Sequence, residues 1–383
     1  MGLLGEEIKK LGFGMMRLPM IEGEVDLEQT KEMTDLFLSK GFSYFDTSWG
    51  YLGGKSEEAI KAAVVDRHPR DSFQIATKCP VFTVKTREAA RGMIWTSLKR
   101  MGLEHVDFYL LHNLGGGRTK MFDDYGMWEW ALELKEKGIV RHVGFSIHDT
   151  AQALDSILTK HPETEFVQFQ LNYDDWESPS VQSKKCLEVS LRHNVPIVVM
   201  EPLKGGLLAN PPESVKRVFT EAGPDASMAS WGLRFAASQP NLITVLSGMS
   251  TMEQMRQNVS LMEDFQPMTE KEFSAVEKAR AALAVLPGVP CTGCMYCVED
   301  CPQNIPIPKV IGAWNRNLTY GDLNTAHGMY VVETFKLGKA SDCAACGNCE
   351  LVCPQHIEIG KNMKIIGEAL DPLPSFLKDP DGA

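Results

Sequence analysis

The chain lacks the long apolar runs, targeting signals and basic excess that mark several functional classes. None of its apolar runs approaches the roughly 18 residues that a membrane-spanning helix needs. Met1 to Glu6 lack the basic, apolar and small-residue pattern of a signal peptide, and Glu6 stands where a myristoylation motif needs Ser or Thr. The formal net charge of -11 argues against a nucleic-acid-binding surface. We therefore expect a cytoplasmic protein with neither a membrane nor a nucleic-acid partner.

Cysteine is scarce in the first 290 residues, where only Cys79 and Cys186 occur among the ten in the chain. A secreted disulfide framework would spread its cysteines, so the clustering of the others favours a metal site. We expect Cys79 and Cys186 to be buried structural thiols. Cys79 should point away from Lys78, because successive residues of a strand face opposite sides of a sheet.

Short apolar runs alternate with helix-period segments from residue 11 to residue 262, at intervals of about thirty residues. Eight of these runs are predicted to be strands, at residues 11–15, 43–46, 73–78, 107–112, 142–146, 166–170, 196–200 and 242–246. The first helix should begin at a capping Asp26 and end at Gly41. Eight such units predict a closed (β/α)8 TIM barrel. The alternative, an open dinucleotide-binding sheet, has no GxGxxG motif to support it.

The segment Pro287-Gly288-Val289-Pro290 stops both helix and strand, and therefore predicts a domain boundary. We expect the barrel to occupy residues 1–286, followed by a small, mainly helical ferredoxin-like domain over residues 287–383. The glycine-rich segment at residues 115–120 lacks the GK[ST] of a phosphate-binding loop, and we expect it to be a flexible loop beside His112.

Two cysteine motifs with one spacing lie in the second domain: both Cys291 and Cys343 begin a C-x₂-C-x₂-C-x₃-C-P run. Three thiolates on one turn can hold three corners of an iron–sulfur cube, and the fourth, before the proline, usually binds the other cluster. Two 4Fe–4S clusters are therefore expected. Their ligand sets are Cys291, Cys294, Cys297 and Cys353 for one cluster, and Cys343, Cys346, Cys349 and Cys301 for the second. Zinc is the alternative, although zinc sites usually use separated pairs of ligands.

The stretch between the two motifs is longer than a compact bacterial ferredoxin uses. Its middle, residues 309–335, is expected to be helical. This arrangement resembles the helical ferredoxin modules that are fused to dehydrogenases.

Three predicted strands end in ionisable residues: Asp46, Lys78 and His112, and Tyr51 follows Asp46 closely. The carboxyl ends of barrel strands are where such folds carry their active sites, so we expect these four residues to form one site. A phenol has an ordinary pKa of about 10, and a nearby ammonium makes its proton easier to release. Asp46 would keep Lys78 charged, and His112 would donate to a substrate oxygen. This set suits protonation of a carbonyl oxygen as hydride reaches its carbon, or the reverse.

With these residues in place, residues 10 to about 265 resemble an aldo-keto reductase. The matching stretches are 11–19 (LGFGMMRLP), 45–51 (FDTSWGY), 56–57 (SE), 77–78 (TK), 110–112 (LLH), 143–146 (VGFS), 167–168 (VQ) with Asn172, 201–203 (EPL) and 257–258 (QN). The family's Asp–Tyr–Lys–His tetrad maps onto Asp46, Tyr51, Lys78 and His112, which makes Tyr51 the general acid. With the cysteine domain, the whole chain is similar to the iron–sulfur branch of the family.

The resemblance also implies a nicotinamide cofactor, NADP or NAD, across the barrel mouth. Ser146 and Gln168 would hold its carboxamide, and the other implied contacts are Met200, Pro202, Leu203, Gly248, Gln254 and Asn258. Three departures from the family concern this cofactor. Ile147 replaces an Asn, Met200 replaces the stacking aromatic residue, and non-basic residues stand at Gly248 and Gln254, where a 2′-phosphate is often gripped.

The sequence therefore predicts an oxidoreductase that interconverts a small-molecule carbonyl and an alcohol. We expect this reaction to be coupled to electron transfer through the two clusters. A redox protein is the partner that such electron transfer would use. Because hydride carries two electrons and each cluster passes one, a flavin relay is not excluded. Two alternatives stay open. The barrel could merely carry the clusters in an electron-transfer or docking protein, or the clusters could only stabilise an ordinary reductase.

Overall fold

The computed structural model describes residues 3–115, 117–179, 181–291, 293, 296–299, 301–353 and 356–372. The chain forms two compact units, Met1–Asn210 with Gly223–Val276, and Pro211–Ala222 with Glu277–Ala383. The expected boundary after residue 286 stays a prediction. None of the described helices is long and apolar enough to cross a lipid bilayer.

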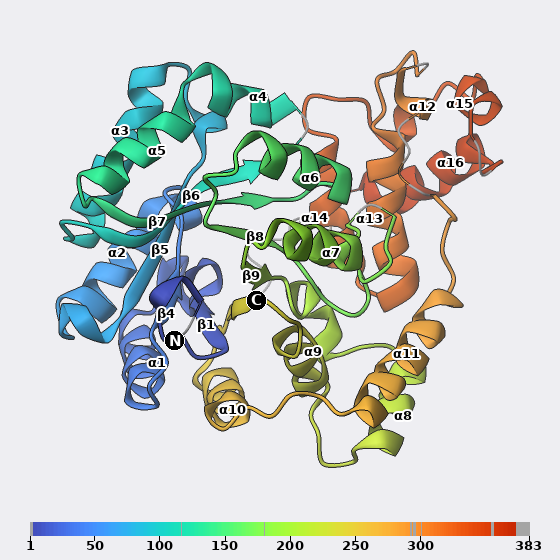
Figure 1. The fold of residues 1–383 in the computed structure, drawn as a ribbon. Coiled ribbons are helices and arrows are strands. Elements are labelled where there is room, and N and C mark those ends of the chain that lie inside the picture. The colour runs from blue at the N-terminus through green and yellow to red at the C-terminus, as the bar shows by residue number, and fades with distance from the viewer. Residues whose placement is uncertain are drawn as a thin grey trace. The chain divides into compact units, whose positions relative to one another are not determined.

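The first unit contains a closed barrel of parallel strands, ordered β1-β10-β9-β8-β7-β6-β5-β4 (Figure 1). The strands are β1 (Leu11–Gly14), β4 (Tyr44–Asp46), β5 (Gln74–Cys79), β6 (Val106–Leu114), β7 (Val140–Ile147), β8 (Phe166–Gln170), β9 (Ile197–Met200) and β10 (Leu242–Ser247). The eight predicted strands and the TIM barrel are thus confirmed. Strands buried on both faces read as continuous apolar runs, which is why the sequence located them well.

Helices follow the strands around the outside of the barrel (Figure 1). They are α1 (Leu27–Ser39), α2 (Lys55–Ile60), α3 (Arg87–Met101), α5 (Met127–Glu136), α6 (Ala151–Lys160), α7 (Ser183–His193), α9 (Met228–Ala237) and α10 (Met252–Glu263). Helix α11 (Glu270–Ala284) contains the division between the two units. The caps of α1 are the expected ones. The Asp26 side chain accepts from the Gln29 amide at 3.0 Å, and Gly41 follows the helix with φ 75.

Some elements were not predicted: the antiparallel pair β2 (Met20–Ile21) and β3 (Glu24–Val25), helix α4 (Gly117–Asp124), and helix α8 (Glu213–Ala222). The expectation of a loop at residues 115–120 was wrong, because α4 begins inside this segment. Side chains stabilise its first turn. Thr119 Oγ1 accepts from the Gly115 amide at 2.9 Å, and Arg118 donates to the Asn113 carbonyl at 2.8 Å. These bonds offset the poor helix propensity of glycine.

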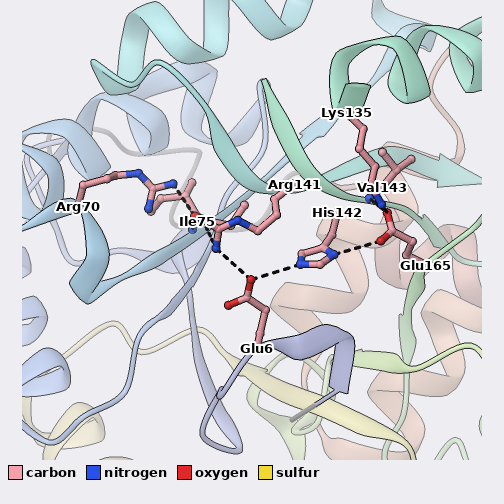
Figure 2. A network of polar contacts seen from close by, with 9 residues as sticks. Glu6, Arg70, Ile75, Lys135, Arg141, His142, Val143 and Glu165 are labelled. Carbon is pink, nitrogen blue, oxygen red and sulfur yellow. Dashed lines mark hydrogen bonds and ion pairs between the residues drawn. The ribbon is translucent and has the colours of Figure 1, made fainter. Parts of the chain in front are cut away.

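An apolar core fills the barrel: Tyr44, Ala76, Phe108, Leu110, Phe166, Val198, Ile243 and Leu246. Leu4 and Ile8 of the N-terminal segment pack against this core. The same segment carries Glu6, which contacts His142 and Arg141 near the start of β7 (Figure 2). Charged residues at this end of the barrel serve its stability, since catalysis in such folds uses the opposite end.

The second unit contains α8, α12 (Tyr296–Glu299), α13 (Ile307–Tyr320), α14 (Leu323–Glu333), α15 (Asn348–Leu351) and α16 (Ile359–Leu370). The expectation of helices within residues 309–335 is confirmed. Tyr330 connects α14 to two other segments of this unit. Its hydroxyl donates to Asp371 at 2.5 Å and accepts from the Ala340 amide at 2.7 Å. The described part of this unit is thus mainly helical, as expected.

Candidate active site and cluster cavity

The barrel brings the four residues of the predicted tetrad together at the carboxyl ends of neighbouring strands. Asp46 ends β4, Lys78 lies near the end of β5, and His112 lies near the end of β6. Tyr51 begins the turn that leads from β4 into α2. The register places Asp46 opposite Ala76 and Lys78 opposite Leu110, so these side chains share one end of the barrel.

The Lys78 ammonium is buried and bound by two oxygens. It forms an ion pair with Asp46 and donates to the Thr47 carbonyl at 2.7 Å. Lys78 is 1% exposed and Asp46 is 3% exposed. Burial alone would lower the pKa of Lys78, but the Asp46 carboxylate and Tyr51 raise it above the ordinary value. Lys78 is therefore a positive charge fixed inside the barrel mouth.

Tyr51 lies against this charge. The Lys78 Nζ is 4.8 Å from the centre of the Tyr51 ring, and the His112 ring meets Tyr51 edge-on at 5.8 Å between centroids. Burial raises the pKa of Tyr51, the charge of Lys78 lowers it, and burial prevails. The phenol thus keeps its proton at neutral pH, beside the ammonium that would stabilise its conjugate base.

His112 is held as a neutral imidazole. Burial, Lys78 and His148 together lower the pKa of His112 to about 3. Its Nδ1 lies 3.1 Å from the Ser48 hydroxyl. A Ser48 O–H that donates to Nδ1 leaves the other ring nitrogen carrying the proton, ready to donate to a substrate oxygen. Sequence reasoning missed both Ser48 and His148, although Ser48 stands only two residues after Asp46.

Ser146 on β7 and Gln168 on β8, the two residues expected to hold a carboxamide, lie opposite each other on neighbouring strands. Both are 2% exposed. The Ser146 hydroxyl accepts from the Asn113 amide at 2.8 Å. The Gln168 Oε1 is buried and has no hydrogen-bond partner among the described residues. A buried amide oxygen without a partner fits an external donor such as a carboxamide NH₂.

The other expected cofactor contacts lie after β9 and β10. Met200 ends β9, followed by Pro202 and Leu203. After β10, two side chains of helix α10 form hydrogen bonds with the end of β10 and with the segment that follows it. The Asn258 amide donates to Ser247 at 3.1 Å, and Gln254 Oε1 accepts from the Ser250 amide at 2.8 Å. Gly248 lies against the side chain of Arg17.

Four thiols in the second unit surround one cavity of about 240 Å³. They are those of Cys301, Cys343, Cys346 and Cys349, the set expected for one cluster. The described residues contain no group of three or more His, Cys, Asp or Glu that could hold a single metal ion. Zinc needs its ligands within about 2.3 Å of one point, whereas a 4Fe–4S cube takes one thiolate at each of several separate irons. Four thiols around one cavity are the kind and number of ligands that a 4Fe–4S cube takes.

Of the four ligands expected for the other cluster, Cys291, Cys297 and Cys353 lie among the described residues, and they pack with the apolar core of the second unit. Cys294 lies outside the described residues. The two remaining cysteines are buried, as expected, and burial raises the pKa of Cys79 and of Cys186 to about 12. The Cys79 thiol lies 3.4 Å from the Met93 sulfur of α3, on the side of β5 away from Lys78.

Comparisons with known proteins agree with both halves. The model of the aldo/keto reductase family matches residues 10–281, and that of the 4Fe-4S dicluster domain matches residues 290–358. An uncharacterised oxidoreductase of Bacillus subtilis (strain 168) is 24% identical over 304 residues, which cover 71% of this chain and 92% of that protein. L-galactose dehydrogenase of Arabidopsis thaliana is 25% identical over 304 residues, covering 72% and 92%.

Solved structures share the barrel. An aldo-keto reductase from Bacillus halodurans in its holo form has a TM-score of 0.59 at 22% identity, covering 73% of this chain and 95% of that one. An aldo-keto reductase from Klebsiella pneumoniae in complex with NADPH has a TM-score of 0.56 at 19% identity, covering 71% and 90%. Such identities show the fold alone. The family match over most of the chain shows that the protein belongs to the aldo/keto reductase family, as an oxidoreductase of that type with a C-terminal 4Fe–4S dicluster domain.

Proposed function

We propose that the barrel reduces a small-molecule carbonyl to an alcohol, or catalyses the reverse, with a nicotinamide dinucleotide. The observation that carries this proposal is the tetrad, in which Tyr51 lies against a buried Lys78 ammonium that Asp46 keeps charged. A chain that only carried clusters would have no need to bury this ion pair, because burying charges costs free energy.

Each residue of the tetrad has one task, and that of Asp46 is to keep Lys78 charged. When bound, the reduced nicotinamide supplies a hydride to the carbonyl carbon. Tyr51 gives its proton to the carbonyl oxygen, so that hydride and proton together complete the alcohol. Lys78 stabilises the phenolate that Tyr51 becomes, and His112 orients the substrate oxygen through its ring N–H. In the reverse direction, the Tyr51 phenolate takes the proton from the alcohol.

The cofactor is assigned as NADP or NAD on chemical grounds. Gln168 and Ser146 offer a buried amide and a hydroxyl on adjacent strands, the partners that a carboxamide needs. The Klebsiella pneumoniae relative, which shares the barrel fold, is in complex with NADPH, and this supports the proposal. Met200, Pro202 and Leu203 would line the same mouth.

The test of this function is Tyr51→Phe, which removes the proton donor and keeps the ring. With NADPH or NADH and a panel of small aldehydes and ketones, wild type should turn over. The variant should lose about 10²- to 10⁴-fold in kcat, the usual contribution of general acid catalysis. Equal turnover by wild type and variant would sink the assignment of Tyr51. An absence of turnover in wild type would favour the docking alternative.

The second half of the proposal is that the clusters exchange electrons with the barrel site or with a redox protein. The two clusters are assigned to the cysteine sets given above, Cys294 included. Cys346 is exposed, so the cluster beside it is open to an electron donor or acceptor. Two one-electron clusters balance one hydride. Since a nicotinamide does not readily split its electron pair, a flavin or similar relay would have to act between them.

An anaerobic titration with NADPH and NADH, followed by visible absorbance and EPR, tests this coupling. Reduction of the clusters by either nucleotide would support it. If the clusters stay oxidised while the enzyme still turns over carbonyl substrate, their role is structural.

A cytoplasmic location is also proposed, because clustered free thiolates suit a reducing compartment.

A further inference from the structure

We propose that Arg100 is a positioning residue for Tyr51 and holds the loop that carries this phenol from both sides. This inference rests on the proposed function, in which Tyr51 gives its proton to the substrate. The loop runs from Trp49 to Gly54, between β4 and α2. Arg100 lies in the last turn of α3, one of the helices on the outside of the barrel. Its effect on the reaction therefore passes through the loop.

The loop needs support from outside itself. Leu52, Gly53 and Gly54 have left-handed backbone conformations, with φ of 52, 66 and 97. In a leucine this conformation costs free energy that the surrounding structure must offset. The Tyr51 amide donates to the Ser48 carbonyl at 3.1 Å, which is a bond within the turn. Such a bond fixes the shape of the turn and leaves its orientation to contacts with other elements.

The Arg100 guanidinium makes such contacts on both sides of Tyr51. Its Nη1 donates to the Trp49 carbonyl at 2.8 Å, and its Cζ lies 4.9 Å from the centre of the Trp49 ring. On the other side, the guanidinium packs against Gly54. A Cβ built on Gly54 would lie 2.8 Å from Cζ and 3.0 Å from both Nη atoms, so only glycine leaves room for this approach. Arg100 thus contacts the first and the last residue of the loop.

A buried carboxylate fixes Arg100 in turn. The Glu57 side chain is 0% exposed, and its Oε2 accepts from Arg100 Nη1 at 3.1 Å. Its Oε1 accepts from the Thr77 hydroxyl at 2.8 Å. Thr77 precedes Lys78 on β5, and the Lys78 carbonyl accepts from the Trp49 amide at 3.2 Å. The main chain of Trp49 is therefore held by the strand of Lys78 through its N–H and by Arg100 through its carbonyl.

This support matters for proton transfer, because a general acid must lie within hydrogen-bonding distance of the atom that it protonates. A misplacement of about 1 Å can lower a rate by about 10²-fold. Removal of the guanidinium leaves the phenol and the Lys78 ammonium chemically unchanged and frees the loop. The loss should therefore appear in kcat. Nucleotide binding should change little, since the expected cofactor contacts follow β7 to β10.

The experiment compares wild type with Arg100→Ala and with the double variant Arg100→Ala/Glu57→Gln, as cluster-loaded, full-length proteins under anaerobic conditions. The double variant leaves no buried carboxylate without its cation, and so separates lost positioning from lost stability. Arg91→Ala is the matched control. Arg91 lies on the same helix, donates to the Gly126 carbonyl at 3.0 Å, and lies 5.3 Å from the centre of the Trp130 ring.

The measured quantities are kcat, KM and the nucleotide dissociation constants, with a carbonyl substrate from the panel that tests Tyr51→Phe. Both Arg100 variants should lose about 10- to 100-fold in kcat, with KM and the nucleotide constants near those of wild type. The Arg100 side chain is 23% exposed, so the space it vacates is open to solvent. Guanidinium ion, far below unfolding concentrations, should restore part of kcat in Arg100→Ala and none in Tyr51→Phe.

Hydrogen exchange, followed by mass spectrometry, gives a measurement that does not depend on turnover. Exchange over residues 49–54 should be faster in both Arg100 variants and unchanged in Arg91→Ala. Far-ultraviolet circular dichroism and cluster absorbance verify folding in every variant.

The outcomes separate this inference from the proposed function. Wild-type kcat in the folded Arg100 variants overturns the inference, while a loss in Tyr51→Phe leaves the proposed function standing. An equal loss in Arg91→Ala, or a rise in KM and in the nucleotide constants that accompanies the fall in kcat, gives Arg100 a general structural role and also overturns the inference. A wild type without carbonyl turnover overturns the proposed function and this inference together.

Discussion

Lys78 is the residue on which the chemistry of the barrel mouth depends. An ammonium that is 1% exposed keeps its proton only where anions or carbonyls face it, and here Asp46 and the Thr47 carbonyl do so. The same charge faces the Tyr51 ring. Burial raises the pKa of Tyr51, and the charge of Lys78, which Asp46 maintains, acts against that rise.

Asp46→Asn should for this reason lower kcat by about 10²-fold or more, although the substituted side chain would touch no substrate. Loss of the carboxylate leaves a buried ammonium without a counter-charge, which costs about 3–5 kcal/mol in the free energy of unfolding. Steady-state kinetics and urea unfolding measure the two effects.

Tyr44→Phe is the matched control for Asp46→Asn, since Tyr44 lies two residues earlier on β4. Its hydroxyl is buried and has no hydrogen-bond partner among the described residues. Removing it should leave the free energy of unfolding unchanged or slightly higher, and kcat unchanged. An Asp46→Asn enzyme with wild-type kcat would show that Lys78 does not need this carboxylate.

At the scale of elements, a charged network joins the amino-terminal ends of β7 and β8 to the N-terminal segment (Figure 2). Glu165 accepts from His142 at 3.2 Å and from the Val143 amide at 2.9 Å, and pairs with Lys135 at 2.6 Å. His142 also contacts Glu6 at 3.3 Å. The network fastens the segment that covers this end of the barrel core.

This network predicts a pH dependence of stability. Burial would raise the pKa of Glu165, but its bonds to His142, Lys135 and Val143 lower it to about 2. A depressed carboxyl pKa stabilises the fold above the unfolded value of about 4.3, and this contribution is lost as pH falls toward the folded value. Glu165→Gln should therefore cost about 2 kcal/mol at pH 7 and much less near pH 2.5.

Urea unfolding of wild type and Glu165→Gln at several pH values measures this difference. Glu28→Gln is the control, because the Glu28 side chain is 84% exposed and its pair with Lys31 should contribute less than about 1 kcal/mol. A gap between wild type and Glu165→Gln that stays constant from pH 7 to pH 2.5 would contradict the assignment of the low pKa.

At the scale of the whole molecule, the barrel and the cysteine-rich unit are separate compact units, each with its own apolar core. Cys346→Ser should remove one ligand from the cavity and lower the iron content by up to about half, while the barrel stays folded. Iron analysis and EPR under anaerobic conditions measure the loss. Cys186→Ser, a variant at a buried thiol of the barrel unit, should leave the iron content unchanged.

Carbonyl turnover in Cys346→Ser then separates the electron-linked reductase from the reductase with structural clusters. Turnover that survives with the barrel intact indicates clusters that are not needed for hydride transfer from a supplied nucleotide. Iron content equal to wild type in Cys346→Ser would mean that this thiol is not a ligand.

The barrel, the ends of its strands and the ligand sets implied by the cysteine spacing could be predicted from the sequence. Buried parallel strands read as apolar runs, and Asp46, Lys78 and His112 stand where those runs end, so local pattern carries this information. Cys301 and Cys343 were assigned to one ligand set from spacing alone, and they line one cavity.

Contacts between residues from distant parts of the chain could be identified only in the folded protein. Ser48 lies beside His112, and Arg17 lies over Gly248, through contacts between segments that have no common pattern. Helix α4 formed where glycines predicted a loop, because Thr119 and Arg118 bond to the preceding backbone. The spacing of apolar residues along the chain indicates whether a segment is a helix or a strand. A contact between two such elements depends instead on how their ends come together in the closed barrel.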